Sequence, residues 1–194
     1  MTESNPVPHR SMGARRFGRV NWLGLRTLAA REIMRFMAVW QQTVFAPLMT
    51  AGLFVIVFSV ALGRGDREVM GLPYLAFLGP GILMMSVIQN AFANTSSSIN
   101  SAKMQRNIVD TLMPPMSPGE ILTGYLAGAV ARAGLVALVI GTGMVLLIGQ
   151  LPQHPLVAVG FIILGALLMG GLGLVGGILA QKFDQMEAIS NFVV

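Results

Sequence analysis

Few residues in this sequence have the types and spacing that chemistry requires. The chain has no cysteine, which excludes disulfides, thiolate metal sites and a cysteine nucleophile. The two histidines, His9 and His154, lie far apart in the sequence. Neither Lys103 nor Lys182 follows the glycine pattern of a phosphate-binding Walker A loop, and no HExxH or GxSxG motif occurs. We therefore expect no catalysis, no metal and no cofactor bound by this chain.

Two polar residues inside apolar stretches are the remaining candidates for function. Arg132 interrupts the apolar run over residues 121–148, and an ionisable side chain inside a membrane is a functional candidate by default. Snorkelling of its guanidinium toward the membrane surface is the simpler alternative. Asn90 lies near the end of another apolar run, where an amide more often forms interhelical hydrogen bonds than binds a ligand.

The composition indicates a protein whose solvent is lipid. Of the 194 residues, 54% are hydrophobic and only 11% are charged, whereas roughly a quarter are charged in a soluble domain. The basic pI of about 10.8 could suggest nucleic acid, but the charge is concentrated before the first apolar run, which suits a membrane surface better. Seven of the thirteen basic residues lie in this N-terminal segment: Arg10, Arg15, Arg16, Arg19, Arg26, Arg31 and Arg35.

Four apolar stretches are long enough to cross a bilayer, which takes about 20 helical residues. They cover residues 44–62, 72–93, 121–148 and 156–180. Because backbone groups in lipid must be satisfied within the segment, each is predicted to be a helix, which makes this an all-α polytopic membrane bundle. Residues 186–194 resemble the first turns of a fifth span, so we expect the sequence to be a C-terminally truncated fragment.

The distribution of lysine and arginine predicts the orientation of the spans. The N-terminal segment, residues 94–120 and the segment after the fourth span carry uncompensated basic residues. In the loop over residues 63–71, two arginines are offset by two acidic residues. The alternation is consistent with a cytoplasmic N-terminus in a multi-pass protein of the inner (plasma) membrane.

Residues 22–40 are predicted to form an amphipathic helix that follows a disordered basic segment over residues 1–21. Arg31 and Arg35 lie on its polar face, where they could meet anionic lipid at the membrane interface. The alternative is a helix packed on other cytoplasmic elements. On a helical wheel the opposite, apolar face collects Trp22, Leu25, Ala29, Ile33, Phe36 and Trp40.

The polar connection between the second and third spans contains a second amphipathic pattern. Apolar residues recur at helical spacing within residues 98–113, and two prolines then end the predicted helix. Ser117, Pro118 and Glu120 form the pattern of a capping box that opens the next helix. From the pattern alone, residues 98–113 could be a plain connector or a helix that transmits motion to a partner.

Several strings in the sequence resemble the permease subunits of ABC-2 type exporters, in particular inner-membrane permeases of multidrug and polysaccharide export. The resemblance extends over residues 22–194, nearly the whole chain. The strings are REIMRF (31–36), WQQTV (40–44), PGILMMS (80–86), QRNI (105–108), PMSP (115–118) and ILTGY (121–125).

This resemblance implies an ATP-driven export permease that moves a drug-like, lipid-linked or polysaccharide substrate outward. It implies a second permease copy and two copies of a separate ABC ATPase subunit, which would bind ATP and magnesium. The family's permeases usually have six spans, so the last of them are missing here. Residues 98–113 then correspond to the coupling helix that contacts the ATPase, with the candidate coupling residues Lys103, Met104, Arg106, Ile108, Asp110 and Leu112.

Two other classes of function are compatible with the sequence. The chain could be a membrane scaffold or regulator that transports nothing. A secondary carrier is disfavoured, because the predicted spans contain no aspartate or glutamate to couple transport to protons or sodium.

Overall fold

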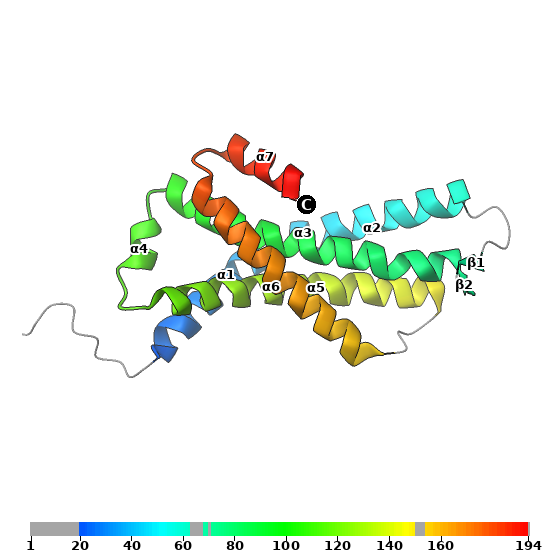
Figure 1. The fold of residues 1–194 in the computed structure, drawn as a ribbon, viewed down its shortest axis with the longest axis horizontal. Coiled ribbons are helices and arrows are strands. Elements are labelled where there is room, and N and C mark those ends of the chain that lie inside the picture. The colour runs from blue at the N-terminus through cyan, green and yellow to red at the C-terminus, as the bar shows by residue number, and fades with distance from the viewer. Residues whose placement is uncertain (1–19, 63–67, 70, 150–153, 194) are drawn as a thin grey trace, which may run out of the picture.

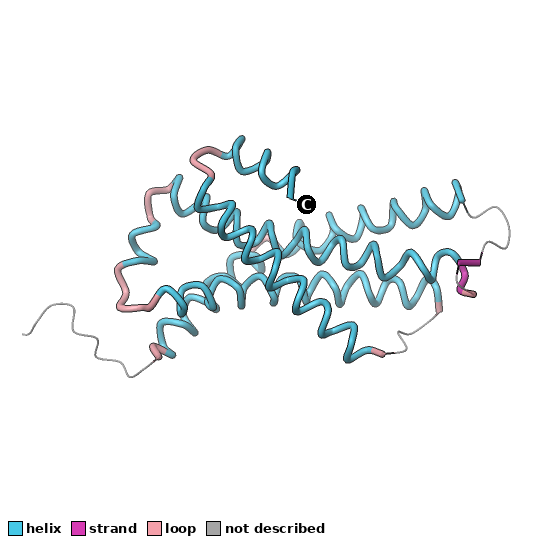
Figure 2. Tube along the Cα trace, viewed as in Figure 1, coloured by secondary structure: helices cyan, strands magenta, loops and turns pink. Residues whose placement is uncertain are grey.

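The computed structural model describes residues 20–62, 68–69, 71–149 and 154–193. Within these ranges the protein is almost entirely helical, with one minimal antiparallel hairpin of two-residue strands (Figure 2). The elements in chain order are α1 (Trp22–Met37), α2 (Trp40–Leu62), β1 (Glu68–Val69), β2 (Leu72–Pro73), α3 (Tyr74–Met104), α4 (Ile108–Leu112), α5 (Pro118–Ile148), α6 (Pro155–Leu179) and α7 (Phe183–Val193).

Four of these helices are long and apolar enough to cross a membrane: α2, α3, α5 and α6. The predicted all-α polytopic bundle with four spans is therefore confirmed. The helix that was expected to begin a fifth span is α7, which begins at Phe183. Residues 1–19 of the predicted disordered segment lie outside the described residues.

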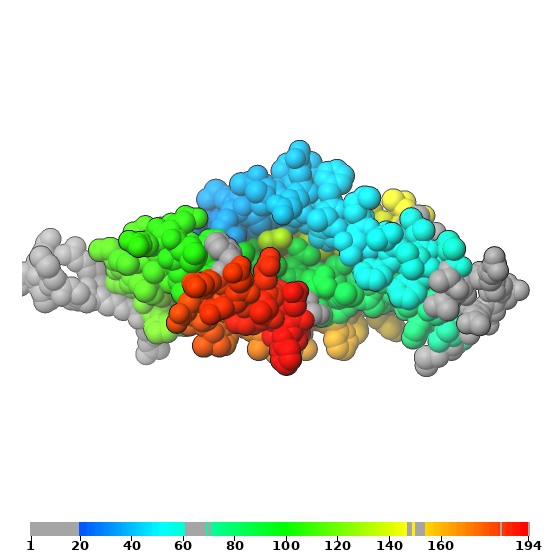
Figure 3. All heavy atoms as spheres, turned by 90° about the horizontal axis from the view of Figure 1, so that it is seen from above, coloured from blue at the N-terminus to red at the C-terminus, as the bar shows by residue number. Residues whose placement is uncertain are grey.

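Helix α3 is the centre of the bundle. It contacts α6 and α5 most extensively, and it also contacts α2 and α7 (Figure 1). Helices α1 and α2 lie along one side of the molecule and α6 along the other, with α7 resting across the surface (Figure 3). This arrangement buries α3 on several sides, whereas α2 and much of α6 keep apolar side chains on the outside.

Two glycines bring α6 unusually close to α3. A Cβ at Gly173 would collide with the backbone of Phe92, and a Cβ at Gly177 would lie 3.0 Å from the backbone oxygen of Ser96. Small residues at such positions let membrane helices approach each other closely, so that packing and interhelical hydrogen bonds hold them together. Thr95 exploits this approach, because its hydroxyl donates a 2.7 Å hydrogen bond to the Gly170 carbonyl of α6.

Helix α3 continues well beyond the predicted span over residues 72–93. The polar residues that follow residue 93 suggest a loop, but they find partners on neighbouring helices and remain helical to Met104. The helix ends because Arg106 adopts a left-handed backbone conformation (φ 60°), which is typical of helix C-termini. The predicted single helix over residues 98–113 is therefore wrong: its first part belongs to α3, and only Ile108–Leu112 forms the separate helix α4.

The predicted helix over residues 22–40 is also divided. Helix α1 ends at Met37, and Trp40 already belongs to α2. At the turn between them, the buried Thr43 hydroxyl donates to the Phe36 carbonyl at 3.3 Å. The same carbonyl also accepts from the backbone N–H of Val39 at 3.2 Å, so the turn supplies the partners that a helix end lacks.

Candidate functional site

Helix α4 forms an exposed apolar surface at one end of the bundle. It lies outside the bundle proper, between the ends of α3 and α5 (Figure 1). Leu112 is 62% exposed and Met113 is 76% exposed, and Val109 and Met104 are exposed as well. An apolar cluster presented by a short helix outside the spans is a plausible contact for another protein. We call Met104, Val109, Leu112 and Met113 the α4 surface.

The predicted coupling residues do not all belong to this surface. Met104 and Leu112 are part of it, and Arg106 and Asp110 are exposed beside it. Ile108 is half-buried. Lys103 is turned the other way, because its ammonium donates to the carbonyls of Gly177, Ile178 and Ala180 at the end of α6. A cation at the C-terminus of a helix compensates carbonyls that lack helical partners, so Lys103 connects α3 to α6.

A hydrogen bond connects helix α4 to α1. Thr111 is buried, and its hydroxyl accepts a 3.0 Å hydrogen bond from Nη1 of Arg31. The start of α1 is joined to the start of α5 in a similar way, since the Asn21 amide donates to Glu120 at 2.7 Å. Glu120 also closes the predicted capping box with Ser117, which the structure confirms. These contacts fix the positions of α1, α4 and α5 relative to one another.

Glu32 lies at the centre of a buried polar cluster between α1, α3 and α5. Its side chain is fully buried, and its carboxylate accepts from Arg31 at 3.3 Å, from Arg35 at 3.3 Å and from the Ser98 hydroxyl at 2.9 Å. Gly128 of α5 provides the room, because a Cβ there would collide with the Glu32 side chain. A buried carboxylate with several donors around it is a strong constraint on helix position.

Arg35 connects the Glu32 cluster to the polar half of α3. Its Nη2 donates to the backbone oxygen of Asn94 at 2.7 Å and to the Asn94 side-chain oxygen at 3.1 Å. Its Nη1 reaches the Ser97 hydroxyl at 3.4 Å. Arg31 also approaches the Tyr125 hydroxyl at 3.3 Å. The sequence placed Arg31 and Arg35 on the polar face of the helix, toward anionic lipid; in the structure both side chains contact the bundle, and their contact with lipid stays a prediction.

Arg132 and Asn90 contact each other. Nε of Arg132 donates to the side-chain oxygen of Asn90 at 3.2 Å, and the Asn90 amide nitrogen donates to the Ser86 carbonyl at 2.9 Å. Asn90 is thus an interhelical hydrogen-bonding residue, as its position predicted. Because Arg132 is half-buried rather than fully exposed, its side chain remains beside the bundle.

The aromatic residues of the predicted interfacial helix have different surroundings. Phe36 is buried, whereas Trp22 is 72% exposed and Trp40 is 49% exposed. Trp22 and Ile33 were expected on the same apolar face as Phe36. In the structure Trp22 and Ile33 are exposed to solvent or lipid, whereas Phe36 is buried in the bundle. The two exposed tryptophans suit a membrane interface, where their amphipathic rings are enriched. Interfacial placement of α1 stays a prediction.

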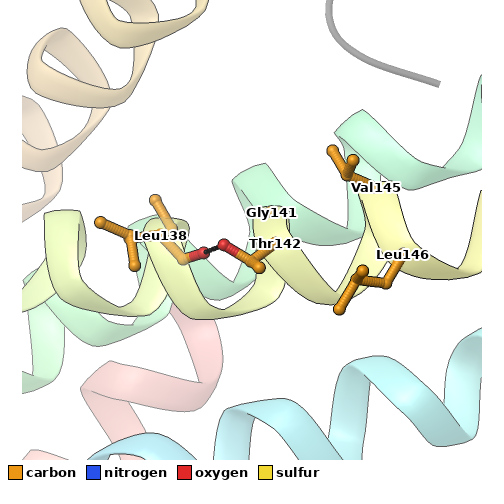
Figure 4. A pocket seen from close by; sticks show the side chains of 6 residues that line it. Leu138, Gly141, Thr142, Val145 and Leu146 are labelled. Carbon is orange, nitrogen blue, oxygen red and sulfur yellow. Dashed lines mark hydrogen bonds between the residues drawn. The ribbon is translucent and has the colours of Figure 1, made fainter. Parts of the chain in front are cut away.

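Shallow hollows on the outer side of α5 show no features of a substrate site. One is lined by Ala137, Leu138, Gly141, Thr142, Val145 and Leu146, all from this helix (Figure 4). The Thr142 hydroxyl is already bonded to the Leu138 carbonyl at 2.7 Å (Figure 4). Binding sites combine a concave apolar surface with a few convergent polar groups, and this hollow presents no such group.

Sequence reasoning missed the central carboxylate of the polar cluster. Acidic residues were expected to matter for function only within the predicted spans, and Glu32 lies before the first span. The available signal was the spacing of Glu32 and Arg35, which places them one turn apart on a helix. Among the described residues, no group of three or more histidine, aspartate or glutamate side chains could hold a metal ion.

Comparison with known proteins identifies the family. A family model described as "ABC-2 type transporter" matches residues 24–194. The chain is 38% identical over 174 residues to the inner membrane transport permease YadH of Escherichia coli K12, an alignment that covers 89% of this chain and 68% of the relative. The YadH proteins of Escherichia coli O157:H7 and Shigella flexneri match equally well. No solved structure matches the chain. With four apolar spans and a family match over most of its length, this multi-pass inner-membrane protein belongs to the ABC-2 type transporter family.

Proposed function

We propose that this chain is an export permease that moves its substrate outward and is driven by an ABC ATPase docked on the α4 surface. The family supports the coarser statement that the chain is the transmembrane permease of an ABC transporter and works with an ATPase subunit. The family therefore also favours a transport subunit without enzymatic activity of its own. In this proposal ATP and magnesium are bound by the partner.

The observation that carries the proposal is the α4 surface. Leu112 and Met113 are among the most exposed large apolar residues in the described part of the chain, and they lie between two spans. Thr111, on the same short helix, is bonded to Arg31 of α1. A partner that moved α4 would therefore act on α1, α3 and α5 together.

The arrangement of basic residues supports a cytoplasmic position for this end of the bundle. Arg10, Arg15 and Arg16 precede α1, and Lys103 and Arg106 precede α4. Because cytoplasmic segments carry the excess of lysine and arginine, the N-terminus and α4 lie in the cytoplasm in this proposal. We further propose a homodimer of permeases with two copies of the ATPase. Membrane lipid surrounds the remaining apolar surface, and nucleic acid plays no part.

The proposed substrate class comes from the resemblance to multidrug and polysaccharide exporters. A drug-like, lipid-linked or polysaccharide substrate fits that resemblance. The apolar outer faces of α2 and α6 are compatible with lateral access from lipid, since large apolar side chains such as Leu53 and Leu168 are exposed there. No charged residue on these faces selects one of the three classes.

The coupling assignment is tested by replacing Leu112 with aspartate in the full-length permease, co-expressed with its ATPase. Burying a carboxylate at a docking surface is expected to weaken the complex about tenfold or more, equivalent to about 1.4 kcal/mol. Co-purification of the ATPase and substrate-stimulated ATP hydrolysis are measured. The matched control is Leu156→Asp, because Leu156 is 87% exposed and begins α6, at a distance from α4 (Figure 1).

Four outcomes separate the candidate functions. Loss of the complex with Leu112→Asp but not with Leu156→Asp supports the ATPase-coupled permease. An unchanged complex and unchanged ATP hydrolysis show that the α4 surface is not the docking site. Absence of any ATPase from the purified full-length protein favours a scaffold, and transport driven by protons without ATP favours a secondary carrier.

A further inference from the structure

Arg132 has unused hydrogen-bonding capacity within a membrane-spanning helix. Its Nε donates to Asn90, but among the described residues its two terminal nitrogens have no hydrogen-bond partner, and no carboxylate forms an ion pair with it. A guanidinium offers five N–H donors in a rigid fork. A charged group at membrane depth needs a compensating partner, because burial without one is costly.

A second arginine brings more positive charge to the same place. Arg35 lies close enough to Arg132 for their like charges to interact. Both contact neighbouring turns of α3, through Asn90 and Asn94. The one carboxylate in this described cluster is Glu32, which is already shared by Arg31 and Arg35. Two guanidinium groups thus share this carboxylate and no described carboxylate pairs with Arg132, so the cluster keeps an excess of positive charge on the Arg132 side.

The excess charge lies at the level where the chain enters the membrane. Arg35 is in the last turn of α1, and the first candidate span begins at Trp40. Trp40 is half exposed, which suits a residue at the membrane interface. Lipid phosphate groups occupy this level of a bilayer.

A buried donor beside Arg35 points to the same place. The side-chain nitrogen of Asn94 is buried and has no hydrogen-bond partner, although the oxygen of the same amide accepts from Arg35. A buried polar atom without a partner is uncommon in folded proteins and calls for an explanation such as an unobserved ligand or water. Arg132 and Asn94 therefore present N–H donors without acceptors, whereas most donors of Arg35 are already bonded to Glu32, Ser97 and Asn94.

We propose that Arg132, with the positive charge of Arg35 beside it, binds the phosphate group of a membrane lipid at the junction of α1, α3 and α5. A phosphate diester supplies what the cluster lacks, namely negative charge and several acceptor oxygens. Arginine binds phosphate through paired N–H···O contacts that lysine does not reproduce. The same chemistry would accept a free phosphate ion, and the experiment distinguishes the two sources.

The test compares Arg132→Gln with the unmodified full-length protein in detergent. Thermal unfolding and native mass spectrometry are measured with phosphatidylglycerol, with a diacyl galactolipid that has no phosphate, and with inorganic phosphate alone. Phosphatidylglycerol is expected to stabilise the unmodified protein and remain bound to it, and the galactolipid is not. Arg132→Gln is expected to bind phosphatidylglycerol about tenfold more weakly.

The matched control is Arg26→Gln, which removes an exposed arginine of α1 that makes no contact with the cluster. It is expected to leave binding of phosphatidylglycerol unchanged. Equal losses in the Arg26 and Arg132 variants would indicate a general charge effect and overturn the site. Equal stabilisation by the galactolipid also overturns it. Stabilisation by inorganic phosphate alone, without retained phosphatidylglycerol, assigns the site to a soluble anion and overturns the lipid assignment.

A second variant covers the case in which Arg132→Gln does not fold. Arg132→Lys keeps the positive charge, which the cluster already accommodates, but loses the planar fork. It is expected to fold and to retain phosphatidylglycerol several-fold less well than the unmodified protein. Retention equal to that of the unmodified protein contradicts the paired contact.

Discussion

Helices α2 and α3 both cross the membrane, but they relate to the rest of the protein in opposite ways. In α2 the described side chains that are buried are those of Thr43 and Ala51. In α3 thirteen residues are buried, and several of them are serine, threonine or asparagine. The comparison shows that an apolar run identifies a span, whereas polar residues within a span indicate where other helices pack.

This difference has an energetic basis. Lipid is as apolar as a leucine side chain, so the apolar surface of α2 gains little by being covered with protein. Polar side chains in α3 gain more, because each avoids lipid by bonding to a neighbour: Thr95 to α6, Ser98 to Glu32 and Asn94 to Arg35. Helix α3 therefore determines the arrangement of the bundle, and α2 is held by fewer contacts.

The largest expected effect comes from removing the carboxylate that α3 shares with α1. Glu32→Ala leaves Arg31 and Arg35 without their acid partner, and we expect a loss of about 3 kcal/mol in the free energy of unfolding. Equilibrium unfolding in mixed micelles measures it. Glu187→Ala, at an exposed position of α7, is the control and should change stability little. Similar losses in both variants would show that Glu32 has no special role.

The next effect concerns the close approach of α3 and α6. Gly173→Ala places a methyl group against the backbone of Phe92, which cannot move aside, and we expect a loss of about 1–3 kcal/mol. Gly171→Ala is the matched control, because a Cβ there meets nothing within 4 Å. Thermal stability of the two variants is compared in one detergent. The packing argument fails if Gly171→Ala is the more harmful substitution.

A smaller effect is expected at the far end of α3. Lys103→Met removes the ammonium that bonds three carbonyls at the end of α6, at a cost of about 1–2 kcal/mol. Without this contact the end of α6 is held less firmly. Exchange of the backbone amide hydrogens at residues 177–180 should therefore increase. Lys182→Met tests charge alone, since Lys182 is exposed on the same segment. Unchanged exchange in the Lys103 variant would contradict the role of this contact.

The smallest effect is expected on α2, and it can be compared directly with a substitution on α3. Leu53 is 62% exposed on α2, and Leu53→Ala should change the free energy of unfolding by less than about 0.5 kcal/mol. Val87 of α3 is fully buried, and Val87→Ala should cost about 1 kcal/mol or more. The same unfolding experiment measures both. A reversed order would mean that α2 is as tightly packed as α3.

The sequence was sufficient to predict the number of spans and the helix start at Ser117. Both depend on local properties: the length of an apolar run, and the spacing of Ser117, Pro118 and Glu120. The length of α3 could not be predicted in this way. Residues after Ala93 are polar and favour a loop by composition, and only their partners on α1 and α6 keep them helical.

The candidate site was also predicted only in part, because some of its features are local and others depend on contacts with other helices. The sequence singled out Arg132 and Asn90 as polar residues within apolar runs and predicted interhelical hydrogen bonds for Asn90, but it did not pair the two residues. The contacts of Arg31 and Arg35 with the bundle could not be predicted, because a helical wheel contains no information about which face a neighbouring helix covers. The coupling residues stay a prediction. Lys103 was assigned to them only because it is close in sequence to α4.

The uninterrupted length of α3 allows this helix to move as one long rod. At 1.5 Å per residue, the part of α3 that follows Pro80 is a rod about 36 Å long, which ends beside α4. A tilt of about 5° at Pro80 would displace the end beside α4 by about 3 Å. Proline removes one helical hydrogen bond, so bending is concentrated near Pro80, close to the β1–β2 hairpin. In the proposed permease, a partner that pushes α4 would therefore swing the long part of α3 relative to its first turns before Pro80.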